Sequence, residues 1–271
     1  MIRSPVVAGQ FYPGSEASLV KNLNSLIPDI QPGEKKEAIA VISPHAGYVY
    51  SGGVAGETFG SVKVPENVVI LGPNHTGYGV PVALMDHGAW EMPMGRVEIN
   101  RKLADAIAES SSQIQVDEVA HRFEHSLEVQ VPFLQYMQKN LAIVPLVVSH
   151  VSYQTCVSIG NGLAEAIKKY GKPVLIVAST DMTHYESRES AGSKDGMALE
   201  RILSLDPEGL YNTVVNNRIS MCGIMPTTVT LIATLALGAK HAELIRYTDS
   251  GEASGDTSKV VGYAGLVVSW Q

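Results

Sequence analysis

Four stretches of the chain are almost entirely apolar and rich in β-branched residues. They do not alternate between apolar and polar positions, as a strand with one face in water would. Strands that are covered on both faces have this continuous pattern, which is typical of a mostly parallel sheet. The sequence therefore predicts four buried strands, at residues 38–43, 67–72, 141–149 and 173–179.

Helical signals lie between and after these stretches. Ser, Asn or Asp stands where a helix would begin, and Pro28 and Gly171 stand where two of the helices would end. The expected helices follow Ser15, Asn100, Ser152 and Asp206, and a largely apolar one covers 226–237. Two late strands are expected at 242–248 and 260–270. Strand and helix alternate, which predicts an α/β fold with a central mostly parallel or mixed sheet flanked by helices.

Composition supports a globular chain with a sizeable core. Of the 271 residues, 45% are hydrophobic and 17% are charged, which is typical of folded domains and argues against disorder. No Pro-, Ser- or Gly-rich tract resembles a linker. We therefore expect one domain over residues 1–271.

Charge and cysteine content narrow the classes of partner and compartment. The chain has 20 Lys and Arg against 27 Asp and Glu, a net charge of −7, and shows no basic stripe for nucleic-acid phosphates. The apolar runs are shorter than the ~20 residues that cross a bilayer. Only two cysteines are present, which indicates a reducing compartment. We expect a cytoplasmic protein with no nucleic-acid partner and no membrane partner.

Polar residues follow several of the predicted strands. His45 follows the first, His75 the second, and Asp181 and His184 the last, while His150 follows the third. In open α/β sheets, ligands bind beyond the carboxyl ends of the strands. If these strands are parallel neighbours, the five side chains meet at one edge of the sheet.

The first two of these histidines have matched surroundings, SPHAGY and GPNHTGY. Neutral imidazole is the commonest metal ligand in proteins, so two strand-end histidines suggest a metal site. A single histidine in such a loop is more often a hydrogen-bonded structural residue. The matched pair, together with the Asp-x-x-His of residues 181–184, favours a shared site.

Cys222 precedes the apolar helix expected at 226–237. A thiol near a helix N-terminus has its pKa lowered by the helix dipole, which favours the thiolate, a metal ligand and a nucleophile. The alternative is a small buried apolar residue. Cys156 lies within a predicted helix and is expected in the core.

The stretch HRFEHSLEVQVPFLQYM, residues 121–137, predicts another helix, with Ser126 as its N-cap. Glu124 and His125 would then lie just before the helix, where they can face a site. Glu128 would lie in the first turn, where a carboxylate is favoured. That placement accounts for Glu128 but not for the Glu-His pair.

Six motifs occur in an order that resembles the Memo family, whose prokaryotic members are labelled AmmeMemoRadiSam system protein B. They run from residue 3 to about residue 226, and VVGYAG near the end also fits. Each is weak alone, and the ordered set is specific. The motifs are RSPVVAGQFYPG, SPHAGYVYSG, LGPNHTGYG, EHSLEVQVPFLQ, STDMTHY and MCGIMP.

The resemblance implies a fold similar to LigB-type class III extradiol dioxygenases, which are non-haem iron(II) enzymes. It implies that His45, His75 and Cys222 are metal ligands. It also implies that Asp181 and His184 flank the metal, with His184 as the acid/base residue. Glu124 and His125 match a family motif and are further pocket candidates. The dioxygenases use two histidines and a carboxylate, so the cysteine is a departure. Fe²⁺ is the expected cofactor, with copper or zinc as alternatives because thiolate is a softer ligand.

Three functions follow from these residues. The first is a metal-dependent, dioxygenase-like redox enzyme acting on a small substrate, with His184 as a proton shuttle oriented by Asp181. The second is a cysteine-nucleophile hydrolase or transferase that uses Cys222, His184 and Asp181. The third is a non-catalytic module that binds a peptide or small ligand, since eukaryotic Memo proteins are associated with signalling in cell motility. The family label also implies a functional link to a radical-SAM enzyme and an AMMECR-type protein.

Overall fold

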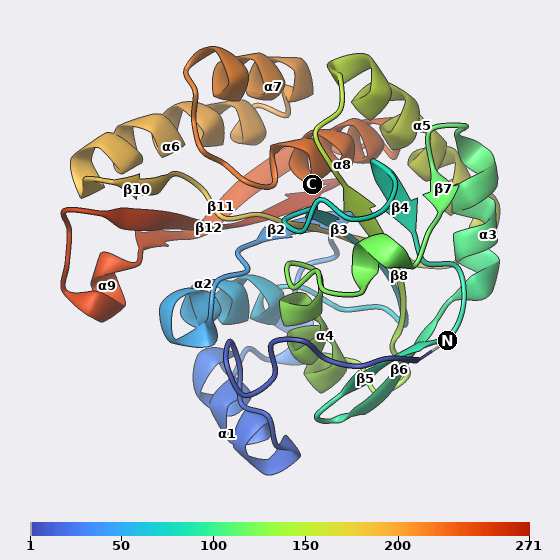
Figure 1. The fold of residues 1–271 in the computed structure, drawn as a ribbon, viewed down its shortest axis with the longest axis horizontal. Helices are drawn as coiled ribbons and strands as arrows, with labels where there is room; N and C mark the ends of the chain where they lie inside the picture. The colour runs from blue at the N-terminus through green and yellow to red at the C-terminus, as the bar shows by residue number, and fades with distance from the viewer. Residues whose placement is uncertain (1) are drawn as a thin grey trace.

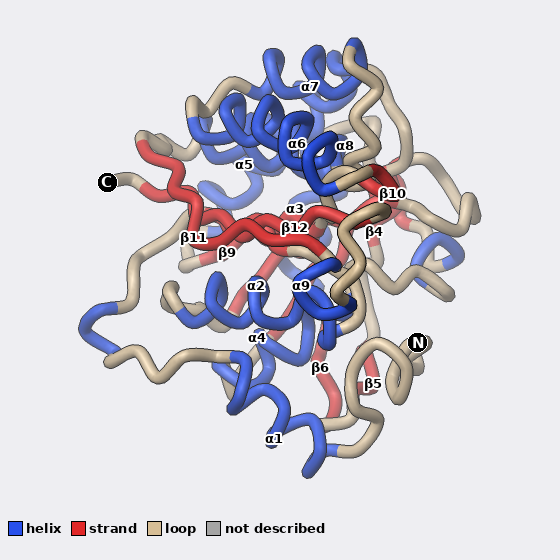
Figure 2. Tube along the Cα trace, turned by 90° about the vertical axis from the view of Figure 1, so that its left-hand side faces the viewer, coloured by secondary structure: helices blue, strands red, loops and turns tan. Residues whose placement is uncertain are grey.

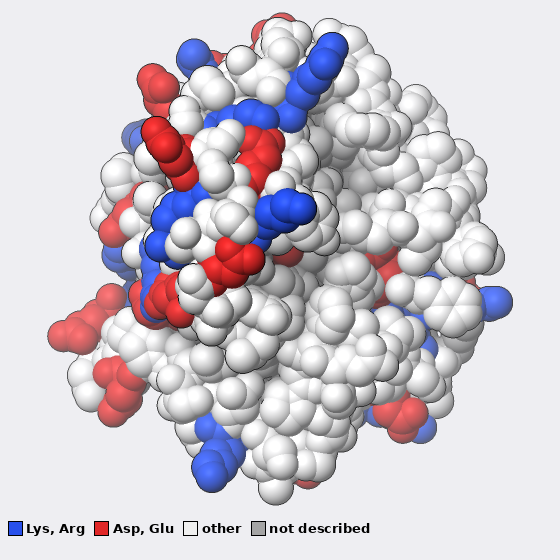
Figure 3. All heavy atoms as spheres, turned by 60° about the vertical axis from the view of Figure 1, so that its left-hand side comes forward, with Lys and Arg blue, Asp and Glu red and all other residues white. Residues whose placement is uncertain are grey.

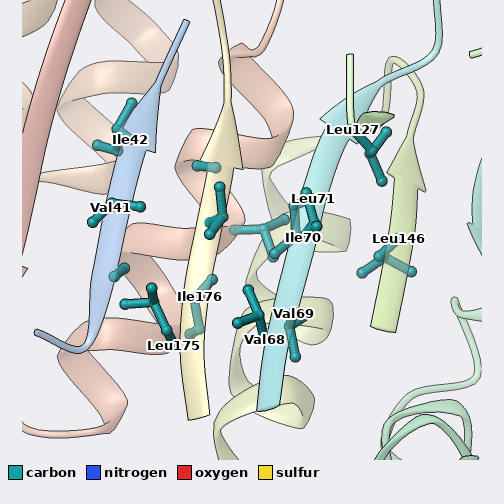
Figure 4. Close-up of a cluster of buried hydrophobic side chains, with 14 of the residues drawn as sticks. Val41, Ile42, Val68, Val69, Ile70, Leu71, Leu127, Leu146, Leu175 and Ile176 are labelled. Carbon is teal, nitrogen blue, oxygen red and sulfur yellow. The ribbon is translucent and has the colours of Figure 1, made fainter. Parts of the chain in front are cut away.

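Four parallel strands form the centre of the molecule (Figure 1). The computed structural model describes residues 2–271. Side by side, the strands are β8 (Ala142–Val148), β3 (Asn67–Pro73), β9 (Val174–Ser179) and β2 (Ala40–Ser43). All four were predicted as buried strands, and their side chains are buried almost throughout. Figure 4 shows them pointing the same way, with apolar side chains between them and the helices.

Further strands, some antiparallel and some parallel, extend this centre into a 12-stranded mixed sheet. On one side, β12 (Val260–Ser269) runs antiparallel to β2, and β11 (His241–Asp249) and β10 (His184–Glu186) pair with β12. The other side carries short strands, namely β1 (Ile2–Arg3), β4 (Val82–Leu84), β5 (Ala89–Met92), β6 (Gly95–Ile99) and β7 (Gln115–Val116). The predicted α/β class with a mixed sheet is therefore confirmed, including the two late strands.

Helices cover both faces of the sheet (Figure 2). One face carries α5 (Tyr153–Tyr170), α6 (Arg188–Leu203), α7 (Pro207–Asn216) and α8 (Ile224–Ala236), and α3 (Arg101–Ser110) packs on α5. The other face carries α1 (Glu16–Leu26), α2 (Tyr48–Gly60), α4 (Val131–Met137) and the short α9 (Gly251–Ser254). This cover on both faces is why the central strands have no polar face.

The predicted helix starts are confirmed. The side chains of Asn100, Ser152 and Asp206 each accept a hydrogen bond from a backbone N–H of the first turn that follows. Gly171 ends α5 with φ of 71°, a conformation that glycine adopts without strain. Ser15 precedes α1 as expected, but its side chain makes no capping hydrogen bond. Local capping chemistry therefore accounts for the start of three of these four helices.

The expected N-cap at Ser126 is wrong. The Ser126 hydroxyl donates a hydrogen bond to the carbonyl oxygen of Pro73, at the end of β3. The helical segment starts later, as a 3₁₀ turn over Glu128–Gln130 that leads into α4. The serine therefore ties the loop 121–127 to the end of β3 and does not cap the helical segment.

The face of the molecule drawn in Figure 3 shows no continuous stripe of only basic or only acidic side chains. Acidic and basic side chains lie side by side there, next to a wide area with few charges of either sign. Among residues 2–271, no helix has both the length and the apolarity that crossing a bilayer requires.

Candidate metal centre

The carboxyl ends of the four central strands meet at one edge of the sheet. Because β8, β3, β9 and β2 are parallel neighbours, the residues that follow them lie along a common rim. Those residues are His150, His75, Asp181 and His45 in that spatial order. The structure therefore places four of the five expected residues along this edge, while His184 lies in β10 with its ring bonded to Ser220.

Three imidazoles form a cluster at this rim. One ring nitrogen from each of His45, His75 and His125 lies within 4.8 Å of the other two. The ring centroids of His45 and His75 are 5.2 Å apart, and that of His125 lies 4.7 Å from the His75 centroid. A single ion with bonds of about 2.0–2.1 Å holds its ligand atoms about 3–4 Å apart. The three rings therefore need only a small adjustment to share one ion.

Cys222 lies against the same cluster. Its Sγ is 3.3 Å from His45 Nε2 and accepts a hydrogen bond from the Asp181 N–H at 3.2 Å. Of the three residues predicted as ligands, the structure places His45 and His75 in the cluster. Cys222 contacts His45, but among the described residues it does not belong to the group whose ligand atoms all lie within 4.8 Å of one another. The structure adds His125 as a fourth possible donor, which the strand-end rule did not predict because His125 lies in a loop.

The hydrogen bonds around Ser179 settle the tautomer of His45. The Ser179 hydroxyl donates to the Ser126 carbonyl at 2.6 Å and accepts from Gln130 Nε2 at 2.8 Å. Its contact with His45 Nδ1, at 2.9 Å, must then be a hydrogen bond that Nδ1–H donates. Burial, followed by the charges of His75 and His125, holds the pKa of His45 well below its usual value. Nε2 is therefore unprotonated and open to a metal.

Glu124 fixes the tautomer of His75 in the way that Ser179 fixes that of His45, by accepting a hydrogen bond from Nδ1. His75 Nδ1–H donates to Glu124 Oε1 at 2.9 Å, and the His75 backbone N–H donates to Oε2 at 2.6 Å. Burial acts to raise the pKa of Glu124, but the hydrogen bond and charge of His75 bring it to about 2. Burial likewise acts to lower the pKa of His75, and Glu124 outweighs it, so that this pKa is raised. A carboxylate on Nδ1 is the usual support of a metal-binding histidine.

His125 stacks on His75 and is held by the N-terminal segment. The two rings are inclined by 29°, and the Phe11 ring meets His125 edge-on at 5.1 Å. Burial lowers the pKa of His125, so the ring is neutral near pH 7. The Glu-His pair, whose place was unexplained in the sequence, thus has two roles: Glu124 fixes His75, and His125 lines the cluster.

The pKa expected for Cys222 is wrong in direction. Burial and the negative charge of Asp181 raise the pKa of this thiol, although hydrogen bonds to the sulfur act in the opposite direction. Without a metal ion, the residue is therefore a thiol. A coordinating metal ion deprotonates a thiol outright, so this pKa is compatible with a ligand and unfavourable for a free nucleophile.

Asp181 and His184 do not form the pair that the sequence suggested. The Asp181 carboxylate accepts the backbone N–H of His45 at 2.7 Å, and burial raises its pKa to about 6. The half-buried His184 ring donates from Nδ1 to the Ser220 carbonyl at 2.9 Å. Asp181 therefore positions the His45 loop, and Ser220 takes the expected role of orienting His184.

Glu128 has a role that its place in a helical turn did not indicate. Its buried carboxylate bonds Arg3 at 2.7 Å, the Tyr12 hydroxyl at 2.7 Å, and the backbone N–H groups of Val6 and Val7. The carboxylate thus fastens the N-terminal segment that carries Phe11 to the centre. Since these partners lie more than 110 residues away in the chain, no local pattern indicated them.

Fold and site together define an α/β protein with a candidate metal centre at the carboxyl edge of its sheet. The family model for Memo-like proteins matches residues 3–267, and the chain belongs to this family. MEMO1 family proteins of Methanothermobacter thermautotrophicus and Aquifex aeolicus are each 42% identical to it. The matches cover 98% of this chain, and 100% and 98% of those proteins.

A solved structure supports the fold alone. The crystal structure of an uncharacterized Escherichia coli K12 protein is similar with a TM-score of 0.52 and 14% sequence identity. The match covers 83% of this chain and 98% of that one.

Proposed function

We propose that this chain is a metal-dependent oxidoreductase with a mononuclear non-haem centre held by His45, His75 and Cys222. Fe²⁺ is the expected ion, with copper or zinc as alternatives, and the substrate is a small molecule. One observation carries the proposal. Both His45 and His75 donate Nδ1–H to a dedicated acceptor, Ser179 and Glu124 respectively, which leaves the Nε2 atom of each ring as the one that can bind a metal, and Cys222 Sγ lies 3.3 Å from that of His45.

The donor set fits a transition metal and not a hard cation. Two neutral imidazoles and one thiolate suit iron, copper(I) or zinc, and do not suit Mg²⁺ or Ca²⁺, which prefer oxygen ligands. A bound redox metal would supply electron transfer and open positions for substrate or dioxygen. His125 is close enough to be a further ligand or to line the open side.

The chain's own groups supply proton transfer. His184 keeps its Nδ1 proton on the Ser220 carbonyl, so its Nε2 can accept a proton or return one. The residue is only partly buried, which connects it with solvent. His184 therefore stays the proposed acid/base residue, positioned by Ser220 and not by Asp181.

The cysteine-nucleophile alternative fits the geometry less well. It requires a thiolate next to His184, whereas Cys222 contacts His45 and has a raised pKa. It also gives no role to the hydrogen bond between Glu124 and His75. The binding-module alternative uses the same pocket and is distinguished by experiment.

Elemental analysis of protein purified anaerobically without chelator tests the proposal. We expect about one iron or copper ion per chain, and loss of most of it in His45→Ala and in Cys222→Ser. Cys156→Ser is the matched control, because that buried thiol lies in α5 against Met225 and outside the imidazole cluster. It should keep the metal.

Dioxygen uptake and turnover of catechol-like compounds by the loaded protein then test the chemistry. Protein that stays metal-free after reconstitution with iron, copper and zinc would refute the metal centre. Alkylation of Cys222 would then separate the nucleophile from the binding module. Stoichiometric metal with no turnover of any oxidisable substrate would favour a binding role for the same pocket.

A further inference from the structure

A groove runs along the edge of the candidate metal centre. A cavity of about 250 Å³ is lined by His75, His150, Cys222 and Met225, among others. A second cavity of about 430 Å³ continues past His150 and Cys222 towards Arg218. The two cavities share His150 and Cys222 in their linings, so both adjoin the candidate centre, and the second also reaches Arg218. Their combined size is that of a small-molecule site.

The charge of this groove differs from that of the chain as a whole. The chain carries seven more acidic than basic residues, yet among the described residues that line the two cavities none is Asp or Glu. The only Lys or Arg in these linings is Arg218. The ion pairs found within residues 2–271 do not include it. A guanidinium without a protein carboxylate is available to a ligand anion.

Apolar side chains form the walls between the two ends. Val148 and Met225 line the cavity next to His75, and Val214, Ile219 and Ile224 line the one next to Arg218. His150 lines both cavities and is exposed. The groove thus offers an apolar passage with one cation at its far end and the imidazole cluster at its near end.

We propose that this groove binds a small organic acid with an apolar body, whose carboxylate pairs with Arg218 and contacts His150. A single guanidinium matches the single charge and the two oxygens of a carboxylate. A phosphate group, with its higher charge, is typically held by several arginines or by a glycine-rich helix start. The claim that the acid is the substrate rests on the proposed function, whereas the claim that it binds does not.

Titration of metal-free protein with benzoate, followed by ligand-observed NMR at low ionic strength, tests the proposal. Benzyl alcohol serves as the uncharged probe of the same shape. We expect benzoate to bind more tightly than benzyl alcohol and to lose about tenfold in affinity in Arg218→Gln, the scale of one charge-assisted hydrogen-bonded pair. Arg218→Lys should retain part of the preference, because it keeps the charge but not the fork of donors.

Two controls make the outcome decisive. Arg101→Gln removes an equally positive, exposed side chain from α3, outside the groove, and should leave benzoate affinity within twofold. His150→Asn removes the imidazole at the junction and should weaken benzoate binding about threefold. Equal affinity for benzoate and benzyl alcohol, or an unchanged affinity in Arg218→Gln, would overturn the proposal. Since the protein is metal-free, either result stands whether or not the metal centre exists.

Discussion

At the scale of single residues, Glu124 has the clearest consequence. It accepts hydrogen bonds from the side chain and the backbone of His75 and from the Ser126 N–H. One carboxylate therefore fixes the tautomer, the ring orientation and the loop of one proposed ligand. Loss of such a supporting carboxylate typically costs 10- to 100-fold in metal affinity.

We predict that Glu124→Gln weakens metal binding about 10- to 100-fold while the protein stays folded. The amide keeps the size of the side chain but removes the charge that supports His75. Competition with a chelator measures the affinity. The competition should be measured near pH 8. At lower pH, protons would compete with the metal for His75 more strongly in the wild type, because its His75 has a raised pKa.

The matched control is Glu91→Gln, at an exposed position on β5. Its metal affinity should equal that of the wild type. Equal affinity in Glu124→Gln as well would show that Glu124 only holds the loop, and would remove the main support for His75 as a ligand.

The sequence predicted three of the site residues because they follow a simple rule. His45, His75 and Asp181 directly follow parallel strands, so the order of the strands brings them together. The participation of His125 was not predictable in this way. Its ring reaches the cluster from a loop tied down by distant contacts, such as those of Arg3 with the carbonyls of His121 and Glu124.

At the scale of elements, α2 differs from the helices that the sequence predicted. It starts at Tyr48, directly after the His45 loop, and contains four glycines, which disfavour a helix. The structure shows what two of them permit. A Cβ atom on Gly56 would lie 2.2 Å from the Leu26 carbonyl oxygen, and one on Gly52 would lie 2.9 Å from the Leu26 side chain. Close packing of α2 on α1 therefore outweighs helix propensity, and no local pattern carries that information.

We predict that Gly56→Ala lowers the free energy of unfolding by about 1–3 kcal/mol. Alanine would favour the helix intrinsically, but its methyl group has no room against the backbone at the end of α1. Urea unfolding measures the change.

Gly192→Ala is the control within another helix. Gly192 lies in α6, and nothing lies within 4 Å of the position that its Cβ would take. Alanine should be neutral there or stabilise by up to about 1 kcal/mol. Similar effects at the two positions would mean that α1 and α2 do not pack this closely.

At the scale of the whole molecule, the site is built from segments that lie far apart in the sequence. The N-terminal segment is fastened by Glu128 and presses Phe11 on His125, while Cys222 comes from the loop before α8. The four central strands and most helix caps follow from local patterns, whereas the order β8-β3-β9-β2 was not predicted from them. The fastening of the N-terminal segment depends on pairs that lie far apart in the sequence, which patterning alone does not specify.

Burial of neutral histidines should make the stability of the whole fold depend on pH. His121 is almost fully buried, donates from Nε2 to the Ala83 carbonyl at 3.1 Å and lies near Arg3 and the Trp90 ring. Burial, then the charge of Arg3, lowers its pKa to about 4, although Asp117 and Glu124 act in the opposite direction. In the unfolded chain, the pKa returns to about 6.5. Between these values the unfolded chain binds more protons than the folded one, so stability falls as the pH drops from about 6.5 to about 4.

We predict that the wild type loses about 2 kcal/mol more stability than His121→Gln between about pH 7.5 and about pH 5. Glutamine does not titrate and can still donate to Ala83. The lowered pKa values of His45 and His125 act in the same direction as His121, and the raised pKa of His75 acts in the opposite direction. All three remain in both proteins, so the difference between wild type and variant isolates His121. Urea unfolding at both pH values measures it. Equal losses in the two proteins would mean that His121 accepts a proton without penalty, and therefore that it is not enclosed between Arg3 and the sheet.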